Sequence, residues 1–189
     1  HTTPPKDANI TQGLNPTASQ TYKVMGTFAG GERDVTSATM FTLKDDTFGA
    51  FKGATLTPIK NIGGKTTVKA EVGSLSVSTS VTLKVRTSVV GTGAPKDATT
   101  WFTTPCTGGT SIPLLYPETG AMVPPNLADF SVMWTDNIAD LWEVKLASAT
   151  SQVKVYTVKQ KHRLSASIWQ LLAYSNVQGA VDITVTGVK

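Results

Sequence analysis

The sequence predicts an all-β fold of two tandem β-sandwiches, the second of which also contains a short helix. At 189 residues, the chain suits two units of roughly 90 to 100 residues, a size that can bury an independent core. Charged residues make up only 16%, while threonine, serine, valine and glycine recur, which is typical of short strands joined by turns. The expected parts are an extended lead-in (1–17), a first sandwich (18–87), a linker rich in small polar residues (88–97) and a second sandwich (98–189).

Composition and charge argue against two classes of partner. The net charge of +4 is spread over lysines without a basic run or an arginine cluster, so we do not expect nucleic-acid binding. No stretch approaches the roughly 20 apolar residues of a membrane span. The chain does not open with an export signal, and we expect that such a signal has been removed from an extracellular or cell-surface protein.

Alternating apolar and polar residues mark the strands of the first half. Tyr22 and Val24 begin the first of these, which Gly30-Gly31 closes with a turn. The alternation continues from Asp34 to Leu43, from Thr66 to Ala70 and from Leu75 to Val85. Gly63-Gly64 and Val72-Gly73-Ser74 supply the hairpin turns between them.

These segments resemble the bacterial immunoglobulin-like group 2 family in order and spacing over residues 18–87. The matching stretches are Asp34-Val35-Thr36, Met40 to Asp46, Gly64 to Ala70 and Ser76 to Val85. Phe41 stands where that family often has tryptophan, and the loop from Thr47 to Pro58 diverges from its pattern. The resemblance implies an immunoglobulin-like sandwich.

The second half is richer in tryptophan and proline. Tyr116-Pro117, Gly120 and Pro124-Pro125 precede the alternating run Phe130, Val132, Trp134. This arrangement resembles the opening of fibronectin type III-like modules, in which a proline-containing loop leads into a strand with a core tryptophan. The resemblance covers residues 98–189 and implies that Trp134 is buried.

Further strands and one helix complete the second half. Trp142, Val144 and Leu146, then Val153, Val155 and Thr157, predict two strands, and residues 181–188 predict the last one. Leu164, Ile168, Leu171 and Leu172 fall on one helical face. Ser167 and Gln170 have the spacing of a capping box, and Asn176 and Gly179 are suitable residues to end the helix.

Histidine and cysteine are too few for the usual catalytic groups. His1 is either one arm of a copper-binding histidine brace or the remnant of a purification tag, and a brace would also require His162. We interpret His162 as a solvated loop residue and Cys106, the single cysteine, as a small buried side chain. Because no nucleophile motif such as G-x-S-x-G occurs, we do not expect an enzyme, a cofactor or a metal.

Acidic residues occur as two pairs, Asp45 with Asp46 and Asp136 with Asp140. Neither pair lies in the compact oxygen-rich loop that calcium prefers, so turn formation is the expected role, with a structural calcium as the alternative.

The aromatic pair Trp101-Phe102 offers the one predicted ligand surface. Flat exposed aromatic rings on a sandwich stack on sugar rings, but the expected role of Trp101 is packing between the two units, with the ligand surface as the alternative. Trp134 and Trp142 have the strand spacing of core residues, and Trp169 lies in the predicted helix.

The expected function is that of a non-catalytic structural, spacer or adhesive segment of a larger extracellular bacterial protein, with further domains in the same polypeptide. Its partner would be a surface protein or a glycan. The alternatives are a carbohydrate-binding accessory region of a secreted glycan-degrading enzyme and a module on the surface of a phage or other virion.

Overall fold

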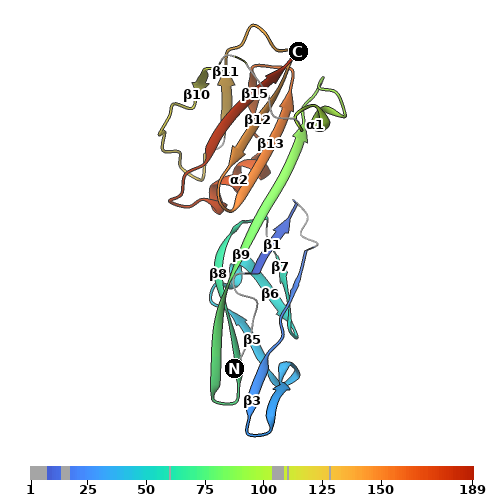
Figure 1. The fold of residues 1–189 in the computed structure, drawn as a ribbon. Helices are drawn as coiled ribbons and strands as arrows, with labels where there is room; N and C mark the ends of the chain where they lie inside the picture. The colour runs from blue at the N-terminus through green and yellow to red at the C-terminus, as the bar shows by residue number, and fades with distance from the viewer. Residues whose placement is uncertain (1–7, 14–17, 60, 104–108, 110, 128) are drawn as a thin grey trace. The chain divides into compact units, whose positions relative to one another are not determined.

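A computed structural model describes residues 8–13, 18–59, 61–103, 109, 111–127 and 129–189 (Figure 1). The chain divides into two compact units, the first ending at Arg86 and the second beginning at Thr87. Strands account for far more of the described residues than helices do, which confirms the predicted all-β class. No helix in the described ranges is long and apolar enough to cross a membrane.

The first unit consists of strands and two short 3-10 helices. In chain order these are β1 (Ala8–Gln12), β2 (Gln20–Thr21), β3 (Met25–Phe28), β4 (Gly31–Asp34), η1 (Thr36–Ala38), β5 (Met40–Leu43), η2 (Asp46–Phe48), β6 (Gly49–Lys52), β7 (Thr55–Pro58), β8 (Gly64–Val72) and most of β9 (Leu75–Val90). β8 pairs with β5 and β9, and β1 pairs with β9 in parallel. A second sheet has the order β2-β7-β6, and β3 and β4 form a separate hairpin.

The strands predicted by alternation are confirmed in β8 and β9, which Figure 1 shows as a long hairpin. Val68 and Ala70 of β8 are buried, while Lys69 between them and Lys65 before them are exposed. Gly73 has a positive φ of 58° in the two-residue turn, a conformation that glycine adopts without a steric penalty. The core of this unit is the buried cluster of Ala8, Ile10, Tyr22, Val24, Phe41, Leu56, Val68, Ala70, Val81 and Leu83.

Two segments of the first unit differ from the sequence-based expectation. Residues 8–12, expected in the lead-in, form β1 and bury Ala8, Ile10 and Gln12. Residues 49–58, expected in a loop, form the hairpin β6–β7 around Gly53, whose φ is +59°. Both segments contain few large apolar residues, and pairing with neighbouring strands compensates for their weak alternation.

The second unit contains two helices, a three-stranded sheet, and three further strands that lie in one sheet with β9. Its elements after the last residues of β9 are α1 (Ala98–Trp101), β10 (Leu114–Tyr116), β11 (Ser131–Trp134), β12 (Leu141–Ala147), β13 (Ser151–Thr157), β14 (Lys161–Arg163), α2 (Ala166–Ser175) and β15 (Asp182–Val188). β12 lies between β13 and β15, β9 lies next to β13, and β11 lies between β10 and β14. The strands predicted around Trp134, Val144, Val155 and Val185 are confirmed.

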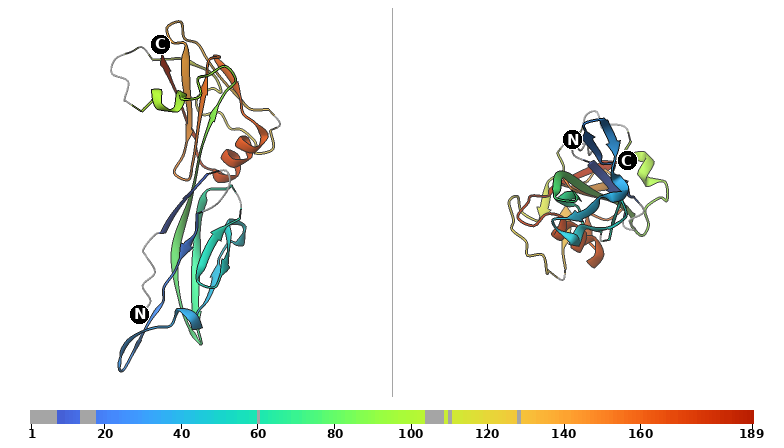
Figure 2. Two further views of the ribbon diagram at one scale, coloured as in Figure 1. Left: turned by 90° about the vertical axis from the view of Figure 1, so that its right-hand side faces the viewer. Right: turned by 90° about the horizontal axis from the view of Figure 1, so that it is seen from below.

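The predicted helix is present, and its buried face agrees with the prediction. α2 buries Ile168, Leu171 and Leu172, and Figure 2 shows it beside β13. The predicted capping box at Ser167 is wrong, because the Ser165 hydroxyl accepts the Ile168 N–H at 3.4 Å and Ser167 already lies inside the helix. Asn176 ends the helix, as predicted.

The segment expected to be a linker has regular structure at both of its ends. Residues 88–90 belong to β9, and Asp97 precedes α1 directly. Between them, the Gly91 N–H donates to the Tyr156 carbonyl at 2.8 Å, and the Ala94 N–H donates to the Gly91 carbonyl. The first bond joins the segment to β13 within the second unit, and the second closes a turn inside the segment.

Candidate functional site

The predicted platform, Trp101 and Phe102, lies at the end of α1, and its two rings face different surroundings. Trp101 is 47% exposed, and its indole N–H donates to the Asp97 carboxylate at 3.2 Å. Phe102 is half-buried, with its ring centroid 5.6 Å from that of Tyr156. Only Trp101 therefore presents an aromatic face to solvent, so the pair does not form one flat surface.

A second aromatic group in the same unit was not found by sequence reasoning. The Phe130 ring is buried, and Trp169 stacks on it with centroids 4.6 Å apart and an interplanar angle of 16°. The Trp169 indole N–H donates to the Pro125 carbonyl at 3.0 Å, while the half-exposed Tyr116 lies 6.0 Å from Phe130. Because the central ring is buried, this group fixes the proline-containing loop onto α2.

Trp134 and Trp142 are core residues, as predicted. They are 2% and 4% exposed, and their rings meet edge to face with centroids 6.1 Å apart. The Trp142 indole N–H donates to the Asp136 carboxylate at 2.9 Å.

One carboxylate of each acidic pair, Asp136 and Asp45, accepts hydrogen bonds within a turn. Asp136 also accepts the backbone N–H groups of Ile138 and Ala139, and the bond from Trp142 is the main cause that lowers the pKa of its carboxyl. Asp45 accepts both the N–H and the hydroxyl of Thr47 at the start of η2. Among the described residues, no three histidine, cysteine or acidic side chains gather as metal ligands.

The interpretation of His162 as a loop residue is wrong. His162 lies in β14, paired with Val132 of β11, and it is half-buried. Burial lowers the pKa of its imidazole. The sequence around His162 is polar and shows no strand pattern. The strand forms because it pairs with Val132 and its neighbours in β11, which lie far away in the sequence. His1 and Cys106 lie outside the described residues.

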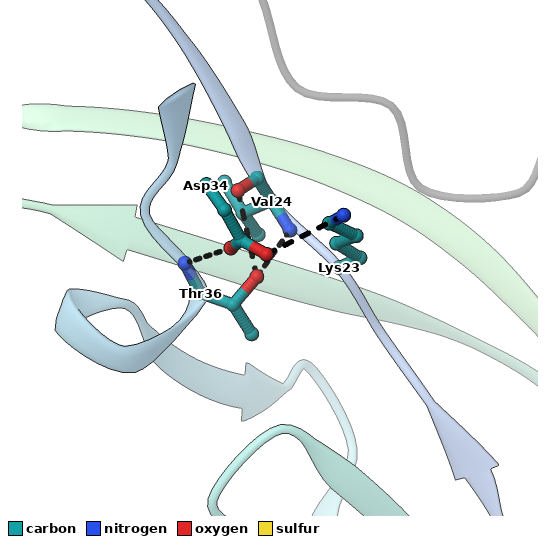
Figure 3. A network of polar contacts seen from close by, with 4 residues as sticks. All are labelled: Lys23, Val24, Asp34 and Thr36. Carbon is teal, nitrogen blue, oxygen red and sulfur yellow. Dashed lines mark hydrogen bonds and ion pairs between the residues drawn. The ribbon is translucent and has the colours of Figure 1, made fainter. Parts of the chain in front are cut away.

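The Asp34-Val35-Thr36 motif forms a polar network that joins η1 to the segment after β2 (Figure 3). The Thr36 hydroxyl accepts the Val24 N–H at 2.9 Å, and the Val35 N–H donates to the Val24 carbonyl at 3.0 Å. The Asp34 carboxylate accepts the Thr36 N–H at 2.9 Å and lies 3.4 Å from the Lys23 ammonium. Hydrogen bonds from Thr36 are the main cause that lowers the pKa of Asp34.

We expect Thr36→Val to lower the free energy of unfolding by about 1–2 kcal/mol, because it leaves the N–H of the buried Val24 without its acceptor. Denaturant unfolding of the full chain measures this change. Thr42→Val is the matched control, since Thr42 is exposed on β5. Equal losses in the two variants would contradict a structural role for the motif.

Comparison with known protein families and with curated proteins finds no match to this sequence. The functional interpretation therefore depends on the geometry of the chain's own residues.

Proposed function

We propose that the chain is a non-catalytic structural, spacer or adhesive segment of a larger extracellular bacterial protein. In this proposal its two units are β-sandwiches, the first immunoglobulin-like and the second fibronectin type III-like. Each unit would carry force or set distance for other parts of the same polypeptide.

Aromatic contacts between sheets support the sandwich assignment in both units. In the first unit, Phe41 of β5 stacks on Phe51 of β6 with centroids 5.4 Å apart, and these strands belong to different sheets. In the second unit, Trp134 of β11 and Trp142 of β12 also belong to different sheets, and their rings meet edge to face with centroids 6.1 Å apart. Packing of two sheets through their inner faces is the defining feature of a sandwich.

The observation that carries the proposal is the parallel pairing of β1 with β9. Residues 8–12 pair in register with residues 81–85 of the strand that leaves this unit. Tension applied before β1 and after β9 pulls the two parallel strands in opposite directions along their length. The hydrogen bonds between them are therefore loaded together rather than one after another, which suits a segment that bears force.

We expect Gln12→Pro to raise the rate of forced unfolding of the first unit by roughly 10-fold. The strand register directs the Gln12 N–H toward β9, so the substitution removes one backbone donor from the β1–β9 ladder, at a cost of about 1–2 kcal/mol. Gln12 has a polar side chain at the end of β1, so little apolar packing is lost. Single-molecule stretching of the chain held by its two ends measures this rate.

Leu56→Ala is the matched control, because Leu56 is fully buried in β7, away from the β1–β9 ladder. It should lower stability in denaturant more than Gln12→Pro does and yet accelerate forced unfolding less. If Leu56→Ala has the larger effect both in denaturant and under force, the β1–β9 pairing does not resist the force. The proposal then loses its main support.

The exposed ring of Trp101 favours a second candidate, a carbohydrate-binding accessory region. Retention on an insoluble polysaccharide that disappears in Trp101→Ala would support that function instead. A virion surface module is a variant of the first proposal and shares its mechanical requirement.

A further inference from the structure

Three lysines form an oblique row across neighbouring strands of the first unit. Lys44 follows β5 and donates its N–H to the Thr67 carbonyl of β8 at 2.8 Å, which places it opposite Thr67. Lys65 of β8 lies opposite Thr82 of β9. Diagonal neighbours on antiparallel strands are about 7–8 Å apart, so Lys65 lies at this distance from both Lys44 and Lys84.

All three lysines occupy the outward face of the sheet. They alternate with inward residues of the core, such as Val68 in β8 and Leu83 in β9. Lys44 and Lys65 are exposed, and Lys84 is half-buried. The row therefore runs over the outer surface of β5, β8 and β9.

Each lysine of the row has a threonine directly opposite it on the next strand. The pairs are Lys44 with Thr67, Lys65 with Thr82, and Lys84 with Thr11 of β1. Within the part of the chain that the structure describes, none of these three threonine hydroxyls has a hydrogen-bond partner in the protein. A pair of one lysine ammonium and one threonine hydroxyl is thus repeated three times along the row.

The lysines of the row have no ion-pair partner among the residues that the structure describes, whereas Lys69 on the same face pairs with Glu71 at 2.6 Å. Asp45 and Asp46 follow Lys44, but Asp45 accepts its bonds from Thr47. Like charges at neighbouring sheet positions are destabilising, and such local conflicts are expected where a surface binds something.

We propose that this lysine–threonine row binds an acidic polysaccharide, whose carboxylate or sulfate groups meet the lysines and whose hydroxyls meet the threonines. The row spans about 15 Å over two diagonal steps, which suits a linear polymer with repeated anionic groups. This inference rests on the adhesive form of the proposed function and names its ligand class.

The composition of the row disfavours other polyanions. Nucleic-acid surfaces use arginine forks for phosphate and aromatic rings for base stacking, and the row has neither. A membrane-binding face inserts apolar side chains beside its basic residues, and all six members of the row are polar.

Binding is tested with polygalacturonate, which carries carboxylates, and dextran sulfate, with neutral dextran, a short DNA duplex and anionic lipid vesicles as comparisons. The wild-type chain should bind at least one acidic polysaccharide, more weakly as salt is added. The variant Lys44→Gln/Lys65→Gln/Lys84→Gln should bind on the order of 100-fold more weakly at low salt.

The control Lys52→Gln/Lys96→Gln/Lys159→Gln removes the same charge from exposed positions outside the row and should remain within about twofold of wild type. Thr67→Val/Thr82→Val should weaken binding of the polysaccharide. Thermal unfolding of each variant should be unchanged, which ensures that weaker binding is not caused by a loss of folded protein.

Three outcomes would overturn the inference: no binding of either acidic polysaccharide, equal losses in the two lysine variants, or equally tight binding of DNA or vesicles. A polysaccharide that binds while Thr67→Val/Thr82→Val has no effect would remove the threonines from the site. None of these results bears on the β1–β9 pairing, so failure here remains distinct from failure of the mechanical proposal.

Discussion

Trp134→Ala should lower the free energy of unfolding of the second unit by about 3–5 kcal/mol. Its ring is 2% exposed and contacts Trp142 across the two sheets, so its loss leaves a cavity where the sheets meet. Its indole N–H has no partner within the described part of the chain, which means that hydrophobic packing alone holds the ring in place. Denaturant unfolding followed by circular dichroism measures the change.

Trp101→Ala is the matched control, because it removes the same side chain from a position that is 47% exposed. Surface substitutions usually change stability by less than about 0.5 kcal/mol. A loss below about 1 kcal/mol for Trp134→Ala would show that the two sheets do not depend on this ring.

Glu143→Ala should lower the free energy of unfolding of the second unit by about 3 kcal/mol. The buried Glu143 carboxylate accepts bonds from the Tyr156 hydroxyl at 2.9 Å and from the Lys154 ammonium at 2.8 Å. Removing the carboxylate leaves the hydroxyl of the buried Tyr156 without an acceptor. The Lys154 side chain is 33% exposed, so its ammonium keeps access to water and adds less to the loss.

The double variant Glu143→Leu/Tyr156→Phe provides the control, because it replaces both buried partners with apolar groups. It should be more stable than Glu143→Ala. If its loss of stability equals the sum of the losses in Glu143→Leu and Tyr156→Phe, the Glu143 carboxylate and the Tyr156 hydroxyl do not interact. Burial is the main cause that raises the pKa of Tyr156 to about 12, with the bond to Glu143 and its charge adding to it. The resulting stability is complete below pH 10 and is lost as the pH rises through 12, a loss that Tyr156→Phe should reduce.

Sequence patterns predicted the strands whose side chains alternate cleanly and missed those whose partners lie far away in the chain. Val68 with Ala70, and Val153 with Val155, are strong signals because one face is apolar. β1 has only Ala8 and Ile10 as apolar residues, and its place depends on Val81 to Val85, about seventy positions later. No local pattern contains that information.

The same limit applies to the candidate sites. The burial of Trp134 followed from its position in an alternating strand. The exposure of Trp101 was not predicted, because packing was the favoured role for its ring. The Glu143–Tyr156 contact was missed because β12 is buried on both faces, and alternation identifies only the face of Trp142 and Val144. The lysine row depends on the register of three strand pairs, which the sequence alone does not fix.

The distribution of tryptophan makes the two units separately visible to spectroscopy. All four tryptophans, at positions 101, 134, 142 and 169, lie in the second unit. Intrinsic tryptophan emission therefore follows that unit alone, whereas the amide signal in the far ultraviolet averages over both. In the intact chain, a gap between the two transition curves would identify the melting of each half without any label or truncation.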